Sequence, residues 1–194
     1  MKTAARFFVI ALLISCGFLT LTEPLSAGEL EELKIGINAI PRTLEPYFDT
    51  ASQAEAVQRL MFDRLVDRDE NGKPIPWLAK SWKPIDDKTW EFRLREDVRW
   101  HNGDEFTADD VKYCLEFVKN PKNKASKVGF LKPIERIEIV DKHNIHIITR
   151  DKWAGILQSL MLINIVPNGY WEKPEKFRPS EHPIGTGRYK FVKW

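Results

Sequence analysis

Two short runs of alternating isoleucine, separated by a polar segment, constrain the fold of this chain more than any other feature. Residues 137–139 are Ile-Glu-Ile, residues 145–147 are Ile-His-Ile, and residues 141–144 between them are Asp-Lys-His-Asn. Alternate side chains of a strand point to the same face of a sheet, and polar clusters favour turns. The pattern therefore predicts a β-hairpin with its isoleucines buried together and its charged residues in water.

Other segments also predict strands. Residues 89–95 alternate cleanly, so that Trp90, Phe92 and Leu94 share one face, and a short strand at residues 65–66 approaches the strong turn signal Asn71-Gly72.

Strands are also expected near both ends of the chain. Residues 33–39 alternate and are followed by Pro41, while residues 188–192 follow a tight turn at Gly185-Thr186-Gly187.

Helices are predicted where apolar residues recur every three or four positions. One begins at Ala51, with Thr50 or Ser52 available as its cap, and another begins after Thr107 and ends at Asn120-Pro121. A third follows later in the chain. The three apolar stripes are Ala54, Val57, Leu60 and Met61; Val111, Cys114, Leu115 and Val118; and Trp153, Ile156, Leu157 and Leu160. The order of strands and helices predicts an α/β fold, with helices packed on a mixed sheet.

Composition supports a globular protein and argues against a nucleic-acid partner. The 194 residues are 43% hydrophobic and 30% charged, which is enough apolar material for a core. The net charge of +2 comes from 30 basic and 28 acidic residues that are spread along the sequence. No block of positive charge is available to bind a phosphate backbone.

The first 27 residues have the pattern of a secretory signal peptide. Lys2 and Arg6 precede an apolar run over residues 7–21, and the small residues Ser26-Ala27 offer a cleavage site. An alternative is a lipobox at residues 13–17, which would anchor the protein through a lipid on Cys16. Apolar residues continue past Cys16, which favours soluble release. An uncleaved anchor is the third option, although the run is short for a membrane span.

Residues with catalytic or metal-binding chemistry do not form a recognisable site. After signal cleavage Cys114 is the one remaining cysteine, which allows no internal disulfide, and its place on a helical stripe favours a buried apolar role over a reactive thiol. His143 and His146 lack the companions of a zinc motif. The paired carboxylates fall at turns or at a helix start. The sequence therefore predicts no catalytic residue, no metal and no cofactor.

Seven tryptophans are present, and their positions suggest two roles. Trp90 and Trp153 lie on predicted apolar faces and are expected in the core. Four others fall in loops or at strand ends, where packing is favoured over lining a pocket: Trp77, Trp82, Trp100 and Trp171.

Four motifs follow one another along the chain, at residues 43–46 (Thr-Leu-Glu-Pro), 72–82, 87–95 with 98–111, and 183–191. Together they resemble solute-binding protein family 5, the extracytoplasmic peptide-, dipeptide- and nickel-binding components of ABC transporters. The first resembles the family's Thr-Leu-Asp-Pro, with Glu in place of the commoner Asp, and residues 72–82 resemble the stretch that follows the family's first helix. Residues 87–95 and 98–111 resemble the central signature, with Asn102 and Glu105 as departures. Residues 183–191 resemble the Gly-Thr-Gly-Pro-Tyr element, with Arg188 in place of the usual Pro. The resemblance extends from Leu33 to the end of the chain.

This resemblance implies a periplasmic-binding-protein-like fold of type II, in its large class, of which the chain supplies part of lobe I and the extra α/β domain. The expected organisation is a signal peptide at 1–27, the start of lobe I at 28–59, the extra domain at 60–165 and a return to lobe I at 166–194. Family members are longer and close two lobes on a ligand. The chain is expected to end before the second lobe and to form one wall of the cleft.

The implied function is capture of a peptide outside the cytoplasm by a monomeric, non-catalytic protein, and delivery of that peptide to an ABC permease. Nickel chelates and other small solutes are alternative ligands. The resemblance points to ligand-binding residues in two regions: Asn38, Ala39, Ile40, Tyr47, Phe48 and Asp49, and the loop at Phe130. Two further hypotheses are a truncated remnant that transports nothing and an exported hydrolase. The hydrolase is disfavoured because no nucleophile and base are suitably spaced.

Overall fold

The computed structural model describes residues 34–173 and 175–193, and the architecture below lies within residues 37–193, which form one compact unit. The predicted signal peptide, its cleavage site and Cys16 lie outside the described residues. No helix in the described ranges has both the length and the apolar character that a membrane crossing requires.

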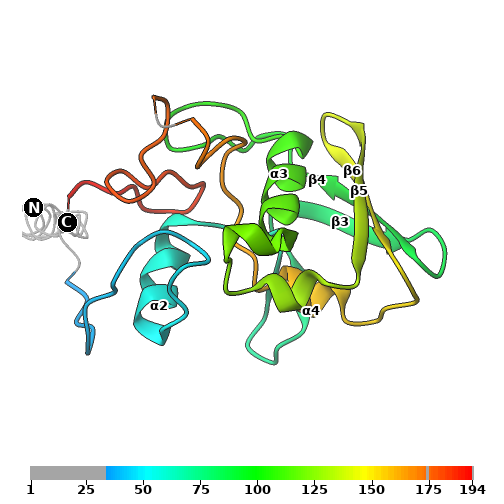
Figure 1. Cartoon of the computed structure of the whole chain (residues 1–194), viewed down its shortest axis with the longest axis horizontal. Coiled ribbons are helices and arrows are strands. Elements are labelled where there is room, and N and C mark those ends of the chain that lie inside the picture. Colours follow the sequence, from blue (N-terminus) through cyan, green and yellow to red (C-terminus); the bar gives the residue numbers. More distant parts are fainter. Residues whose placement is uncertain (1–33, 174, 194) are drawn as a thin grey trace, which may run out of the picture. The chain divides into compact units, whose positions relative to one another are not determined.

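The centre of the fold is a four-stranded antiparallel sheet (Figure 1). Its strands are β3 (Ala79–Pro84), β4 (Thr89–Leu94), β5 (Ile134–Asp141) and β6 (Asn144–Thr149), in the spatial order β3-β4-β6-β5. Neighbouring strands pair antiparallel throughout: two hairpins, β3–β4 and β5–β6, supply all four strands, and they join through the pairing of β4 with β6.

The predicted isoleucine hairpin is confirmed. Ile137 lies opposite Ile147 and Ile139 lies opposite Ile145 in the β5–β6 register. Ile137, Ile145 and Ile147 are buried, but Ile139 is 37% exposed. Since β5 is an edge strand and Ile139 lies near its end, the core covers this residue incompletely.

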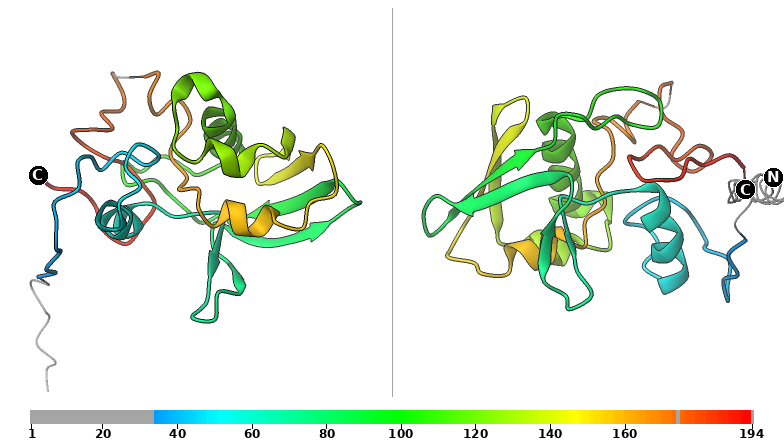
Figure 2. Two further views of the ribbon diagram at one scale, coloured as in Figure 1. Left: turned by 60° about the horizontal axis from the view of Figure 1, so that its bottom comes forward. Right: turned by 180° about the vertical axis from the view of Figure 1, so that it is seen from behind.

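Helix α3 (Ala108–Lys119) packs against the sheet and contacts β5 (Figures 1 and 2). It ends at Asn120 before Pro121, as predicted, because proline cannot continue the backbone hydrogen bonds. All four residues of its predicted stripe are fully buried: Val111, Cys114, Leu115 and Val118.

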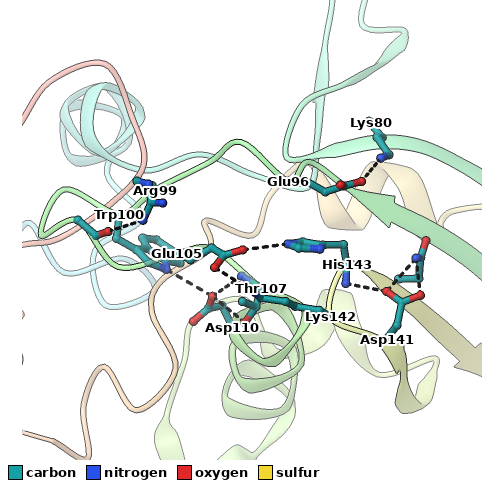
Figure 3. Close-up of polar contacts among 12 residues, drawn as sticks. Lys80, Glu96, Arg99, Trp100, Glu105, Thr107, Asp110, Asp141, Lys142 and His143 are labelled. Atoms are coloured by element: carbon teal, nitrogen blue, oxygen red, sulfur yellow. Dashed lines mark hydrogen bonds and ion pairs between the residues drawn. The ribbon is translucent and has the colours of Figure 1, made fainter.

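The start of α3 is fixed by a buried carboxylate (Figure 3). Asp110 accepts hydrogen bonds from the backbone N–H of Thr107 at 2.7 Å and of Asn168 at 2.7 Å, and from the Trp100 indole at 3.3 Å. Burial raises the pKa of Asp110, and the two backbone N–H groups oppose that rise. The carboxylate thus joins the helix start to two distant segments.

The turn of the β5–β6 hairpin is tied to the residues before α3 (Figure 3). Lys142 pairs with Glu105 at 2.8 Å, and the Lys142 carbonyl accepts the Ala108 backbone N–H at 2.9 Å. Within the turn, Asp141 accepts the His143 N–H at 2.8 Å, which is the local hydrogen bonding expected of an aspartate in a turn.

The remaining elements are short. They are α2 (Ser52–Met61), β1 (Val66–Arg68), β2 (Pro74–Pro76), two 3₁₀ turns at Pro121–Asn123 and Val128–Leu131, and α4 (Ile156–Leu160). The predicted turn at Asn71-Gly72 is confirmed between β1 and β2, with Gly72 at a φ of +79°. The third predicted helix is shorter than its stripe, since Trp153 precedes α4.

The capping prediction for α2 is wrong. Ala51 occupies the N-cap, so neither Thr50 nor Ser52 caps the helix with its side chain. The carboxylate of Asp49 instead accepts the Ala51 backbone N–H at 3.0 Å. An aspartate two residues away thus supplies the hydrogen-bond acceptor.

The two predicted terminal strands are also wrong over the residues described. Residues 34–39 and 188–192 have no strand partner in the described part of the chain, and Ile37 is 44% exposed. Alternation alone does not make a strand, because backbone N–H and C=O groups need a neighbouring strand. The later segment follows the end of α2 instead, where Tyr189 donates its backbone N–H to the Leu60 carbonyl at 3.0 Å.

The prediction for two tryptophans needs correction. Trp90 and Trp153 are only half-buried at the edge of the core, whereas Trp100 is 3% exposed and lies within it. Trp100 is buried because its indole donates to Asp110 and its ring packs edge-on against Phe106 at 6.0 Å.

His101 fastens residues 185–187 to the body of the unit. Its backbone N–H donates to the Gly185 carbonyl at 2.9 Å, and its Nδ1 accepts the Gly185 N–H at 3.3 Å. Since Nδ1 accepts, Nε2 carries the hydrogen in the neutral ring and donates to the Gly187 carbonyl at 2.8 Å. The Gly187 N–H in turn donates to the Met61 carbonyl at 2.9 Å.

This close contact explains why glycine occupies position 187. A Cβ at Gly187 would lie 2.6 Å from the Leu60 carbonyl oxygen, which is backbone and cannot rotate away. We therefore expect Gly187→Ala to lower the free energy of unfolding by about 2 kcal/mol, a typical cost of overpacking. Urea denaturation followed by circular dichroism measures this change.

Gly129→Ala is the matched control, because no atom lies within 4 Å of a Cβ built at Gly129. It should change the stability by less than about 0.5 kcal/mol. Equal midpoints for the two variants would show that the segment moves away at no cost.

Candidate ligand-binding surface

Of the segments predicted from sequence to bind ligand, the structure joins residues 47–49 to the turn that leads to Phe130. The Tyr47 carbonyl accepts hydrogen bonds from the Ser126 backbone N–H at 2.9 Å and from the Ser126 hydroxyl at 2.5 Å. The loop at residues 47–49 therefore lies beside the turn that carries Phe130.

Tyr47 anchors this loop to the core of the unit. Its side chain is 1% exposed, its hydroxyl donates to the Asn164 backbone carbonyl, and its backbone has a φ of +80°. Burial raises the pKa of the phenol well above its usual value. A positive φ is uncommon for a bulky residue, and here the buried ring and its hydrogen bond maintain it.

The exposed members of the predicted site are largely apolar. Ile40 is 79% exposed, Phe130 is 49% exposed and Phe48 is 39% exposed, and Asn38 and Ala39 are also exposed. These side chains can contact another molecule without any rearrangement of the core.

Phe48 is held in place by Trp171. The two rings pack edge to face, with centroids 5.8 Å apart and an interplanar angle of 89°. Trp171 stacks on Phe117 at 4.1 Å, and its indole N–H donates to Glu45 at 2.9 Å. The packing role predicted for Trp171 is confirmed by these contacts.

Asp49 closes the loop on itself. The carboxylate is buried, accepts the Arg42 backbone N–H at 3.1 Å and lies 3.6 Å from the Arg42 guanidinium. The backbone N–H groups of Ala51 and Arg42 lower the pKa of Asp49 below its usual value. This side chain therefore shapes the loop.

A buried polar network, which the sequence did not predict, underlies the loop. Arg64 donates to the Asn164 side chain at 3.1 Å and to Glu55 at 2.7 Å, and Gln58 donates to the Glu45 carbonyl at 3.2 Å. Arg64 and Asn164 are 100 residues apart and only 4% and 0% exposed. The one sequence signal was the polar residue Gln58 among the apolar positions of α2.

Charges around Glu55 explain its ionised form. Burial raises the pKa of Glu55, but the positive charges of Lys127 and Arg64 outweigh burial and lower it. Lys127 is itself buried, and its ammonium donates to the Leu162 carbonyl at 2.7 Å. The network therefore extends to the turn that leads to Phe130.

A groove of about 440 Å³ borders the same loop. Residues 42–44 form one side, and residues 180–182 and 191–193 form the other. None of the site residues predicted from sequence lines this groove. Its size is within the range of small-molecule sites.

Neither a cluster of metal ligands nor an activated thiol is present among the described residues. No group of three or more histidine, cysteine or acidic side chains among residues 34–173 and 175–193 could hold a metal ion. Cys114 is buried, as predicted, and burial raises the pKa of its thiol to about 12. Such a thiol is a poor nucleophile at neutral pH.

The architecture is that of part of a periplasmic solute-binding protein. Residues 73–194 match the sequence model of a family described as "Bacterial extracellular solute-binding proteins, family 5 Middle". The chain therefore belongs to this family. The family resemblance and the α/β fold of a periplasmic binding protein are thereby confirmed.

Three similar proteins illustrate the relationship. The nickel-binding periplasmic protein of Escherichia coli is 30% identical over 148 residues, which are 74% of this chain and 28% of that protein. The periplasmic murein peptide-binding protein of Escherichia coli is 31% identical over 126 residues, which are 63% and 24% of the two chains. The crystal structure of NikZ from Campylobacter jejuni in complex with Ni(L-His) superposes on this chain with a TM-score of 0.71 and 36% sequence identity. The aligned region is 81% of this chain and 32% of the NikZ chain. The chain thus spans about a third or less of the length of these proteins.

The buried network should contribute strongly to stability. Arg64→Met would remove the hydrogen bond that the buried Asn164 Oδ1 accepts and the ion pair with Glu55, so we expect the free energy of unfolding to fall by about 2 kcal/mol. Arg59→Met is the control, because Arg59 pairs with Asp67 at 3.0 Å in a more exposed setting and should cost less than about 1 kcal/mol. Denaturant midpoints compare the two variants, and equal losses would contradict a central role for Arg64.

The loop should also respond to acid through Asp49. A lowered folded-state pKa means that the carboxylate stabilises the fold above the pKa of an unfolded aspartate, about 3.9, and that this stability is lost as the pH falls through the folded-state value. The backbone amide signal of Ala51 should therefore titrate with a midpoint below about 3.9 in NMR spectra. Asp49→Asn should abolish the titration, whereas a wild-type midpoint above that value would contradict the assignment.

Proposed function

We propose that this chain provides one wall of a solute-binding cleft and that the complete protein captures peptides for an ABC-type importer. Family membership supports the class, and the exposed apolar residues on two joined loops support the location. Nickel complexes are the second candidate ligand, because one relative is a nickel-binding protein and NikZ was solved with Ni(L-His).

Backbone groups next to the loop suit a peptide ligand. Residues 37–40 are exposed and make no backbone hydrogen bond within the described part of the chain. An extended peptide can pair with such a segment through its own N–H and C=O groups, without regard to its side chains. Ile40, Phe48 and Phe130 would then contact the peptide side chains, while Tyr47 and Asp49 hold the loop and Asn38 and Ala39 offer backbone contacts.

The wider assignment follows the family. Residues 28–59 and 166–194 would belong to lobe I, and residues 60–165 to the extra domain. Residues 1–27 would direct export to the periplasm, with lipid attachment at Cys16 as the alternative. The protein would act as a monomer, without catalysis or cofactor, and would deliver its solute to a membrane permease.

Calorimetric titration of the chain tests the proposal. A mixture of tripeptides to pentapeptides should bind with a Kd of about 1 mM, since one wall buries little ligand surface. Phe48→Ala or Phe130→Ala should weaken binding about fivefold.

Ile85→Ala is the matched control, because Ile85 is an equally exposed apolar residue at 49%, in the β3–β4 turn. It should leave the affinity unchanged. Binding of Ni(L-His) in place of peptides would favour the second ligand class. If neither the peptides nor Ni(L-His) bound in the titration, the result would favour a non-functional remnant.

A further inference from the structure

A second pocket, distinct from the loop surface, has the chemistry of a carboxylate site. It has a volume of about 280 Å³ and lies between the end of α2, the β2–β3 connection and residues 186–188. Two arginines, Arg95 and Arg188, line it together with Asp63. Their formal charges sum to +1, so one monoanion would neutralise the pocket.

Both arginines have hydrogen-bond donors to spare. Arg95 uses its Nε to donate to the Trp77 carbonyl at 2.6 Å, and over residues 34–173 and 175–193 its two terminal nitrogens have no protein acceptor. The Arg188 guanidinium makes no hydrogen bond or ion pair within the same residues. Guanidinium groups bind carboxylates through paired N–H donors, which gives geometric specificity.

Asp63 is poorly placed to pair with Arg95 and Arg188 in the way that a ligand carboxylate would. Its two carboxylate oxygens already accept from the Trp77 indole at 2.7 Å and from the Thr186 hydroxyl at 2.8 Å. No ion pair joins it to either arginine of the pocket in the described ranges. The carboxylate therefore orients Trp77 and Thr186 while the guanidiniums remain available.

The other walls are apolar and fixed in position. Trp77 is held through its side chain by Asp63 and through its backbone by Ala79, and Leu78 donates its N–H to the Arg64 carbonyl at 3.1 Å. Val98 completes the apolar lining. A preorganised pocket loses little conformational entropy on binding, and an indole wall suits a flat ligand body.

We infer that this pocket binds a small organic monocarboxylate with a flat apolar body, held by Arg95 and Arg188 and packed on Trp77. The pocket volume is at the lower end of known small-molecule sites, which suits a ligand of about the size of benzoate. The apolar walls disfavour inorganic phosphate, which would leave them uncovered.

Titration of the full chain with benzoate, followed by saturation-transfer NMR and calorimetry, tests the inference. Benzoate should bind with a Kd of about 1 mM or tighter, and neutral benzamide at least tenfold more weakly. Arg95→Gln and Arg188→Gln should each weaken benzoate binding about tenfold.

Arg150→Gln is the control, because Arg150 is exposed and does not line the pocket; this variant should bind benzoate as the wild type does. Phe48→Ala should also leave benzoate binding unchanged, which separates this site from the proposed peptide surface. Equal binding of benzoate and benzamide, equally tight binding of phosphate, or no binding up to about 10 mM would overturn the inference.

Discussion

The contact between Arg64 and Asn164 is the constraint on which the arrangement of the other loops depends. The two residues come from opposite ends of the described unit, form an isolated antiparallel bridge, and share a side-chain hydrogen bond at 3.1 Å. A buried guanidinium is costly unless its donors are satisfied, and Asn164 and Glu55 satisfy it. Any movement of residue 164 away from Arg64 would leave the buried Arg64 Nε–H without its acceptor, although Glu55 would still pair with the charge.

This constraint reaches the surface through Tyr47. The Asn164 backbone carbonyl accepts the Tyr47 hydroxyl, and the Tyr47 carbonyl accepts two hydrogen bonds from Ser126. Two successive hydrogen bonds, Arg64 to Asn164 and Tyr47 to Asn164, thus connect the buried Arg64 guanidinium to Tyr47, the residue that precedes Phe48. Buried polar groups often specify one arrangement where an apolar core would permit several.

The part of the fold that was predicted from sequence is the part that local periodicity determines. The α3 stripe at Val111 and Cys114 and the Ile137–Ile147 pair depend on spacings of three, four or two residues, which are visible in one sequence. The two wrong terminal strands fall where a distant partner decides the outcome. Residues 34–39 alternate, yet a strand also needs a neighbour, and nothing in the local sequence reports whether one is present.

The candidate site shows the same division. The family resemblance pointed to the loop at residues 47–49 and to the turn at Phe130 as candidates, but it did not distinguish the buried Tyr47 and Asp49 from the exposed Phe48. That distinction depends on Ser126 and Asn164, which lie 79 and 117 residues away from Tyr47. Sequence similarity transfers a position, whereas burial at that position depends on the whole packing arrangement.

Arg188 shows how a departure from a family motif can carry information of its own. Its neighbours in the Gly-Thr-Gly segment are fixed by His101 and by the carbonyls of α2, so the backbone there has little freedom. Proline would supply no donor at position 188, whereas arginine places a guanidinium beside Arg95 in a pocket that Asp63 only partly neutralises. Two like charges in one small pocket repel each other, and a bound carboxylate would turn that repulsion into a pair of charge-assisted hydrogen bonds.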